Sequence, residues 1–337
     1  MTEMTVLNGV AIEELLTIPM AVEAVEQAYL EKSKGDAALW PMVFHEFDPG
    51  HADLDIKSGD LGGLGFYGLK VVSWFGANPG KGLPALYGTS LLFDLATGAP
   101  RALLNAGPIT DFRTGAAGAI GAKYLARPDA GTLLMAGTGA LAPYLIAATL
   151  YLLPQIKTVY VANPHHPECS AAACEAITPQ VEKLLSGCGG CHAAIAAAPD
   201  LEKAVRHSDV ILTATPAREP FIKAEWVQPG THISCVGADM SGKQEVDSAL
   251  FASAKVFGDD TAQCLSVGEC EVPYKAGVFS GHICEIGGVI SGAEAGRTDA
   301  SDITIFDSTG IALQDIATAA ALLQAAQETG KGQTVTL

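Results

Sequence analysis

The sequence predicts an α/β protein in two parts, one with a parallel sheet and one of the α+β type whose strands are joined by turns. From residue 130 onward, continuous apolar runs alternate with helical segments, which is typical of parallel strands buried on both faces. A glycine-rich turn joins the first of these runs to its helix. Residues 40–104 instead hold short β-rich runs broken by Gly, Pro and Asn, which favours strands joined by turns.

Size and composition exclude several classes of protein. The chain has 337 residues, 49% hydrophobic and 17% charged, which is enough apolar surface to bury a core and too much for a disordered chain. Its net charge of −17 opposes binding to nucleic acid or to an anionic membrane. The longest apolar stretch, 140–154, is shorter than the ~20 residues of a membrane helix. Residues 1–5 lack the basic segment of a signal peptide, and eight cysteines are no disulfide framework, so a reduced, cytoplasmic protein is expected.

The first part of the chain is expected to contain helices and several strands. Residues 19–34 carry an apolar stripe at helical spacing and are followed by Gly35, which predicts an amphipathic helix. Residues 111–126 are rich in small side chains and predict a helix that packs closely on its neighbours. Strands are expected at 68–74, 87–94 and 101–105, with a turn at 94–98 between the last two.

The second part is expected to alternate strands and helices. Residues 132–136 predict an apolar strand, and residues 141–153 predict the helix that follows it. Further buried strands are expected at 158–162, 210–214, 232–236 and 254–257. The last helix, 314–328, is long and apolar enough to return to the first part of the chain.

The turn after the first strand of the second part reads G-x-G-x-x-A, in the order Gly137, Thr138, Gly139, Ala140, Leu141 and Ala142. In dinucleotide-binding proteins the first glycine allows the tight turn, the second lets the backbone approach a pyrophosphate, and the small last residue allows close packing of helix on strand. Free N–H groups at the start of the helix then face the anion. An ordinary tight turn is the alternative, but the strand–turn–helix–strand context favours a Rossmann-type dinucleotide-binding domain.

The end of the second strand bears on the choice between NAD and NADP. An NAD site usually has Asp or Glu there, which accepts a hydrogen bond from the ribose 2′-hydroxyl. This chain instead has Asn163, Pro164, His165 and His166. Asn163 is neutral, and the two histidines either face a 2′-phosphate or are solvated loop residues. The expected cofactor is therefore NAD or NADP.

Two cysteine and histidine patterns are set aside. Residues 188–192 match the C-x-x-C-H haem-attachment pattern, but covalent haem attachment requires export and the segment is typical of a loop. The paired spacing of zinc ligands is not found at His165, His166, Cys169 and Cys174. No metal site is expected.

Three charged residues are candidates for a substrate site. Lys70 lies in an apolar strand and Arg113 among small residues, so each requires an anionic partner. That partner is either an internal carboxylate, which the residues alone favour, or a ligand. Asp239 follows a strand at the expected carboxyl edge of the parallel sheet, where ligands of open α/β sheets bind. The alternative for Asp239 is a helix N-cap or a turn residue.

Together these motifs resemble the ornithine cyclodeaminase/mu-crystallin family. The resemblance includes LKVVSWFGANPGKGLPALYGTSLLFDLATGAPRALLNAG, ITDFRTGAAGAIGAKYLAR and LLMAGTGALA. It continues through TATPAREP, VGADMSGKQEVD and DITIFDSTGIALQDIATA, and thus covers nearly the whole chain in order. Members include cyclodeaminases, alanine dehydrogenases, ketimine and iminosuccinate reductases, and a thyroid-hormone-binding crystallin. The phrase GADMSGKQE followed by AQCLSVGEC is similar to the iminosuccinate-reductase branch.

The resemblance implies a homodimer with two domains in each subunit. Residues 1–125 and 312–337 would form a substrate-binding and dimerisation domain that is mostly antiparallel β. Residues 126–311 would form the Rossmann domain that binds NAD or NADP. The implied partners are a small amino, imino or keto acid and a second copy of the chain.

The resemblance also assigns roles to residues of this chain. Lys70 and Arg113 would bind the α-carboxylate of the substrate, and Asp239 would act as acid or base on the substrate nitrogen. Thr309 would be a further substrate contact. The segments that line the cofactor in relatives correspond here to Gly137, Thr138, Gly139, Ala140, Leu141, Asn163, Pro164, His165, Thr213, Ala214, Thr215, Val236, Gly237, Ala238, Lys243, Asp307 and Ser308.

One departure from the family bears on the substrate. Family members usually carry an arginine shortly after a proline in the first β segment, as a further carboxylate ligand. Residues 40–45 of this chain hold no arginine. Either His45 or Lys57 replaces it, or carboxylate recognition is altered, which argues against ornithine as the substrate.

The expected reaction is hydride transfer between a nicotinamide cofactor and the α-carbon of a small amino or imino acid. The enzyme would be an imine reductase or an alanine-dehydrogenase-like amino-acid dehydrogenase. The alternative is a cyclodeaminase that forms proline from ornithine with catalytic NAD. A third possibility is a non-catalytic protein that binds NAD(P) or a small ligand, as the crystallin does. The presence of Lys70, Arg113 and Asp239 together argues against this third possibility.

Overall fold

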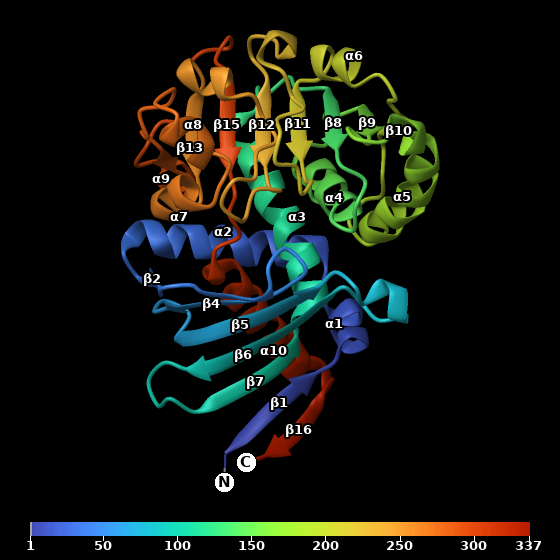
Figure 1. The fold of residues 1–337 in the computed structure, drawn as a ribbon. Coiled ribbons are helices and arrows are strands. Elements are labelled where there is room, and N and C mark those ends of the chain that lie inside the picture. The colour runs from blue at the N-terminus through green and yellow to red at the C-terminus, as the bar shows by residue number, and fades with distance from the viewer. Residues whose placement is uncertain (1) are drawn as a thin grey trace. The chain divides into compact units, whose positions relative to one another are not determined.

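The structure, a computed structural model, describes residues 2–337. It divides the chain into two units, each built around its own sheet (Figure 1). The first unit consists of Met1–Arg113 and Ile311–Leu337, and the second of Thr114–Gly310. This confirms the α/β class, with one parallel sheet and one sheet that is mostly antiparallel.

The sheet of the first unit has the order β16-β1-β7-β6-β5-β4-β2, and β3 also pairs with β4. Only β1 and β7 run parallel among these pairs. Because β1 pairs with β16, the two ends of the chain lie side by side (Figure 1). The strands are β1 (Glu3–Leu7), β2 (Ala37–Leu39), β3 (Val43–Asp48), β4 (Ala52–Leu61), β5 (Phe66–Phe75), β6 (Leu86–Asp94), β7 (Pro100–Asn105) and β16 (Gln333–Thr336).

Helix α10 (Ala312–Thr329) packs on β4 and β5 and against α2 (Ile18–Lys34). Two glycines of the sheet allow this close approach. A Cβ on Gly59 would lie 3.1 Å from Leu313, and a Cβ on Gly68 would lie 3.4 Å from Ile316. The start of α10 therefore lies over the paired residues Gly59 and Gly68, near the end of β4 and the start of β5. The short helix α1 (Gly9–Leu15) precedes α2.

The sheet of the second unit is parallel throughout, in the order β10-β9-β8-β11-β12-β15-β13-β14. Numbered within the unit, its first five strands follow the 3-2-1-4-5 order of a Rossmann fold. The strand order reverses between β8 and β11, which places a crevice at the carboxyl ends of these two strands. The strands are β8 (Thr132–Ala136), β9 (Thr158–Ala162), β10 (Ala194–Ala197), β11 (Val210–Thr213), β12 (His232–Cys235), β13 (Lys255–Gly258), β14 (Cys284–Glu285) and β15 (Thr304–Asp307).

The helices of the second unit fill the connections between its strands. They are α4 (Ala142–Leu152), α5 (Ser170–Leu185), α6 (Leu201–Arg206), α7 (Thr261–Ser266), α8 (Glu271–Lys275) and α9 (Ile286–Ser291). In the part of the chain that the structure describes, no helix is both long and apolar enough to cross a bilayer.

Helix α3 (Ala106–Leu125) belongs to both units, and this moves the expected boundary. The sequence analysis placed the division at 125/126, whereas the structure places it at 113/114. The carboxyl-terminal half of α3 packs into the second unit through small residues: a Cβ on Gly115 would lie 2.7 Å from Tyr144, and Ser234 donates a hydrogen bond to the Gly118 carbonyl. The second boundary, 310/311, differs by one residue from the expected one.

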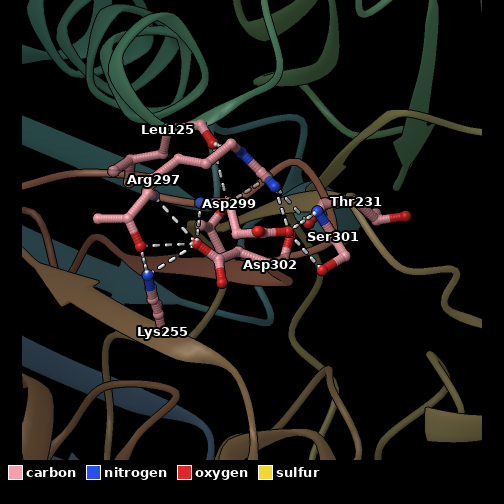
Figure 2. Close-up of polar contacts among 9 residues, drawn as sticks. Leu125, Thr231, Lys255, Arg297, Asp299, Ser301 and Asp302 are labelled. Atoms are coloured by element: carbon pink, nitrogen blue, oxygen red, sulfur yellow. Dashed lines mark hydrogen bonds and ion pairs between the residues drawn. The ribbon is translucent and has the colours of Figure 1, made fainter.

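Hydrogen bonds and one ion pair connect residues at the amino-terminal edge of the parallel sheet (Figure 2). Arg297 donates hydrogen bonds to the carbonyls of Leu125 and Thr231 and to the Thr304 hydroxyl. Lys255, at the start of β13, forms an ion pair with Asp302 at 2.7 Å. These contacts anchor the segment before β15 at the edge opposite the carboxyl ends of the strands. They do not involve the carboxyl ends of the strands, where open α/β sheets bind their ligands.

Candidate active site

The first unit brings Lys70 and Arg113 together on one carboxylate. Lys70 Nζ lies 2.9 Å from Asp315 Oδ1, and Arg113 Nε lies 3.2 Å from the same oxygen. All three side chains are buried. The internal carboxylate that the residues alone favoured is therefore present, at the start of α10. Two cations share one of its oxygens, and Asp315 Oδ2 accepts no hydrogen bond from the described part of the chain.

Neighbouring residues fix the guanidinium and the ammonium in place. Arg113 Nη1 donates to Gln314 Oε1 at 3.0 Å, and Gln314 Nε2 donates to the Tyr29 hydroxyl at 2.8 Å. Lys70 also donates to Thr110 Oγ1 at 3.4 Å. A lysine ammonium has three N–H donors and a guanidinium has five, so both cations keep donors beyond these bonds. An incoming carboxylate can accept them.

Burial and the neighbouring charges determine the protonation of Lys70 and Asp315. Burial and the neighbouring Arg113 lower the pKa of Lys70 to about 8, although Asp315 opposes this change. Burial alone would raise the pKa of Asp315, but Arg113, Lys70 and Lys57 outweigh it and hold that pKa below its ordinary value. Asp315 is therefore ionised, and one carboxylate stabilises two adjacent cations.

The two residues that could replace the missing arginine lie on opposite faces of the sheet. Lys57 on β4 stands directly opposite Lys70 on β5, so both side chains point to the buried face under α10. His45 on β3 pairs in register with Leu54, an odd number of residues from Lys57. Its ring is exposed and contacts Phe47. Lys57 joins the cation cluster, whereas His45 does not.

The glycine-rich turn of the second unit has the geometry that a dinucleotide requires. Gly137 has a φ of +132°, and a Cβ there would lie 2.6 Å from the Ala214 carbonyl. A Cβ on Gly139 would meet nothing within 4 Å, so the backbone is open to a ligand there. The N–H groups of residues 138–141 make no hydrogen bond among the described residues. Helix α4 thus begins with free donors beside the crevice between β8 and β11.

Asn163 is occupied in shaping the loop after β9. Its Nδ2 donates to Thr138 Oγ1 at 3.0 Å, and its Oδ1 accepts hydrogen bonds from the N–H groups of His165 and His166. Both histidines are exposed, and His166 lies 3.4 Å from the Glu168 carboxylate. The negative charge of the Glu168 carboxylate at this place would repel the 2′-phosphate of NADP.

Asp239 lies in the exposed loop after β12, at the carboxyl edge of the parallel sheet. Its carboxylate is half exposed and forms an ion pair with Lys243 Nζ at 2.5 Å. Lys243 also reaches the Gly237 carbonyl at 3.5 Å. The predicted acid and a predicted cofactor residue are therefore in direct contact.

Comparisons with known proteins agree with this geometry. The profile of the ornithine cyclodeaminase/mu-crystallin family matches residues 2–330. The chain belongs to this family.

Three solved structures show how much of the fold is shared. The iminosuccinate reductase of Paracoccus denitrificans in complex with NAD+ is 32% identical, with a TM-score of 0.88 over 99% of this chain and 100% of that one. An archaeal alanine dehydrogenase dimer with bound NAD is 35% identical, with a TM-score of 0.86 over 99% of both chains. The Thermococcus litoralis Δ1-pyrroline-2-carboxylate reductase in complex with NADH and L-proline is 31% identical, with a TM-score of 0.86 over 98% of this chain and 100% of that one.

In this family member, a buried carboxylate holds two of the predicted cofactor loops together. Glu245 Oε2 accepts hydrogen bonds from the Thr213 hydroxyl at 2.6 Å and from the Gly237 N–H at 3.1 Å. Its Oε1 accepts from the N–H and the hydroxyl of Thr215. Burial raises the pKa of Glu245 to about 7 although these bonds oppose it. The hydroxyls of Thr213 and Thr215 therefore shape the loops after β11 and β12.

A second buried carboxylate acts in the same way after β15. Asp259 accepts hydrogen bonds from the hydroxyls of Ser308 and Thr309 and from the Gly310 N–H. Asp307 is fully buried, accepts a hydrogen bond from the Cys270 N–H, and has its pKa raised to about 7 by burial. The side chains of residues 307–309 thus serve the internal packing of this loop.

Sequence analysis missed the carboxylates on which these loops and cations depend. Asp315 lies in the mostly apolar first part of α10, and the reasoning that singled out Lys70 applies equally to it. Glu245 and Asp259 lie beside other polar or charged residues and carry no such signal. The described residues contain no cluster of three His, Cys, Asp or Glu side chains able to bind a metal, and Cys188 and Cys191 are free thiols.

Proposed function

We propose that this chain is an NAD-dependent oxidoreductase that transfers hydride to or from the α-carbon of a small amino or imino acid. The observation that carries this proposal is the buried pair of cations, Lys70 and Arg113, on one oxygen of Asp315. Such an arrangement holds a surplus of positive charge that a substrate carboxylate neutralises. The names of the similar proteins, a dehydrogenase and two imine reductases solved with NAD, NAD+ or NADH, support it.

Different residues bind the substrate and transfer the proton. Lys70 and Arg113 bind the α-carboxylate and so orient the α-carbon, which supplies much of the catalysis by positioning. Asp239 acts as acid or base on the substrate nitrogen, with Lys243 fixing its orientation. Gln314 and Tyr29 hold the guanidinium of Arg113 in position through their hydrogen bonds.

The cofactor is NAD rather than NADP in this proposal. The free N–H groups of residues 138–141 and the open backbone at Gly139 fit a pyrophosphate. The Glu168 carboxylate beside His166 opposes the phosphate that distinguishes NADP. When bound, the nicotinamide ring donates or accepts the hydride.

The active protein is a homodimer in this proposal. Within residues 2–337, strand β3 pairs only with β4, so its other edge is open, and it exposes Val43, Phe44 and Phe47. Phe75, Leu86 and Tyr87 add exposed apolar surface at the neighbouring ends of β5 and β6, and Phe47 stacks on Phe75. A second copy of the chain would cover this edge, as the archaeal dimer suggests.

The direct test follows absorbance at 340 nm with purified protein. One arm supplies NADH with ammonia or methylamine and a panel of pyruvate, oxaloacetate, glyoxylate and cyclic imines. Stoichiometric loss of NADH is expected with at least one of them. Asp239→Asn should lower kcat by roughly 100-fold while the dissociation constant for NADH stays unchanged, because general acid–base catalysis contributes about that much. The matched control is the exposed Asp36→Asn, which should behave as the wild type.

A second arm separates the reductase from a cyclodeaminase. It supplies NAD+ with ornithine and assays ammonia and proline. A cyclodeaminase returns its hydride to the same substrate, so it would form both products without net change at 340 nm. That result, with no NADH consumed in the first arm, would replace the proposed function. Tight NADH binding with no turnover in either arm would instead indicate a ligand-binding protein.

A further inference from the structure

The loop after β12 that carries Asp239 is held by a carboxylate from another element. The Ser241 hydroxyl donates to Glu271 Oε1 at 2.5 Å, and the Gly242 N–H donates to Glu271 Oε2 at 2.7 Å. Glu271 lies in the first turn of α8 and is only 1% exposed. One buried side chain therefore accepts hydrogen bonds from two consecutive residues of the loop, two and three positions after Asp239.

The remaining contacts of Glu271 keep it in its charged form. Lys275, on the same helix, forms an ion pair with Glu271 Oε1. Burial alone would raise the pKa of Glu271, but the hydrogen bonds from Lys275, Ser241 and Gly242 outweigh it and hold that pKa below its ordinary value. Glu271 is therefore ionised at neutral pH. Hydrogen bonds to an ionised acceptor are stronger than those between neutral groups, so the loop is firmly held.

Asp239 depends on the backbone of this loop for its position. Its side chain is 50% exposed, and it forms an ion pair with Lys243, which belongs to the same loop. An ion pair within a loop moves with the loop and does not fix it relative to the sheet. The loop itself is anchored on both sides of Asp239, by the bond from the Gly237 N–H to Glu245 and by the two bonds to Glu271.

We infer that Glu271 is a positioning residue for the reaction: it fixes the loop after β12 so that the Asp239 carboxylate keeps its orientation for proton transfer. The inference rests on the proposed function, in which Asp239 is the acid or base on the substrate nitrogen. Such a group must lie within hydrogen-bond reach of the proton, and a displacement of about 1 Å can lower the rate about 100-fold. Glu271 acts through Asp239 and does not itself contact the substrate.

The test measures kcat and KM at saturating NADH with ammonia and the compound of the panel that the wild type turns over fastest. Glu271→Ala should lower kcat by about 10- to 100-fold through misplacement of Asp239. KM and the dissociation constant for NADH should stay within about twofold of the wild type, because other residues bind the substrate carboxylate and the cofactor. The matched control is Glu182→Ala, at an exposed glutamate of α5, which should behave as the wild type.

A conservative variant should restore the activity. The amide of Glu271→Gln has the same length, accepts a hydrogen bond from the Gly242 N–H and donates one to the Ser241 hydroxyl. It should therefore retain most of the wild-type kcat. A Gln variant as slow as the Ala variant would mean that the loop bonds are not what Glu271 contributes, and would overturn the inference.

A double-mutant cycle separates positioning from general stabilisation. If Glu271 acts through Asp239, adding Glu271→Ala to Asp239→Asn should lower kcat by less than about twofold further. Losses that multiply in full, or a weaker affinity for NADH in Glu271→Ala, would show that Glu271 only stabilises the unit. Either result would overturn the inference and leave the oxidoreductase intact, as would a wild-type kcat in Glu271→Ala or in Asp239→Asn alone.

Two further measurements cover an unstable variant and an inactive wild type. If Glu271→Ala does not fold, Ser241→Ala removes one of the two loop bonds at an exposed residue and should lower kcat by about threefold, but only while Asp239 is present. A wild type without turnover would contradict the proposed function. Hydrogen exchange would then test the anchor alone: residues 237–243 should exchange faster in Glu271→Ala than in Glu182→Ala, and equal exchange would overturn the inference.

Discussion

At the scale of single residues, the protonation of Lys70 sets the pH range of substrate binding. Its pKa is lowered to about 8, chiefly by burial and then by Arg113. Only the protonated form binds a carboxylate, so kcat/KM for the keto acid at saturating NADH should fall about tenfold per pH unit above about 8. Lys70→Arg should retain activity and lose this alkaline limb, because arginine stays charged over the whole range.

The same shift affects stability in a direction that can be checked independently. The folded pKa of Lys70 lies below that of an unfolded lysine, so the unfolded chain binds more protons between pH 8 and about 10.5. The contribution of Lys70 to the free energy of unfolding should therefore increase as pH rises through this window, so the folded state becomes more stable. Lys70→Arg should abolish this increase. An alkaline limb that persists in Lys70→Arg would mean that another group controls binding.

At the scale of elements, the two glycines of the turn before α4 should separate folding from cofactor binding. A Cβ on Gly137 would overlap the Ala214 carbonyl, and its φ of +132° is unfavourable for alanine. Gly137→Ala should therefore lower the thermal midpoint of unfolding and weaken NADH binding. Gly139→Ala adds a methyl group in open space, so it should leave the midpoint unchanged and weaken NADH binding by obstructing the pyrophosphate.

These two variants are matched, since each adds the same methyl group to the same turn. Thermal unfolding and NADH fluorescence titration measure the two effects separately. Unchanged NADH affinity in Gly139→Ala would show that the pyrophosphate does not approach this backbone. An unchanged midpoint in Gly137→Ala would show that the turn relaxes around the new Cβ.

Strong apolar patterns allowed the sequence to predict most elements of the parallel sheet. The predicted strands 132–136 and 158–162 match β8 and β9, since each is a continuous apolar run between turns. The predicted helix 111–126 begins earlier, at Ala106, because Pro108 and the glycine near it are tolerated in the first turn. Strand β16 was not predicted, since all of its residues are exposed and it is defined by pairing with β1.

The site was predictable only where a residue conflicts with its local surroundings. Lys70 and Arg113 stood out as cations among apolar or small residues. Their partner Asp315 is more than 200 positions further along the chain, and no local pattern links it to them. Likewise, Thr213 ends β11 and Thr215 follows it, where ligand-binding residues often lie, but Glu245 accepts the hydrogen bonds of both hydroxyls. Such pairings depend on the tertiary fold and become visible only in the structure.

At the scale of the whole molecule, charge and apolar surface act in opposite directions on association. The net charge of −17 makes two copies repel each other, while the open aromatic edge of β3 favours their contact. Burial of that edge should dominate, because salt at physiological concentration screens the repulsion beyond roughly 8 Å. A dimer is therefore expected, with a dissociation constant that falls as the ionic strength rises.

Light scattering of one charge-introducing variant and its control would test this balance. Phe47→Asp places a carboxylate on the exposed β3 edge and should convert the dimer to a monomer. Leu95→Asp changes an exposed leucine in the turn after β6, outside this edge, and should remain dimeric at the same protein concentration. If the Phe47→Asp variant stays dimeric at every ionic strength, the β3 edge does not form the interface. If the wild type is monomeric even at high salt, the apolar edge is too small to overcome the repulsion and the homodimer is excluded.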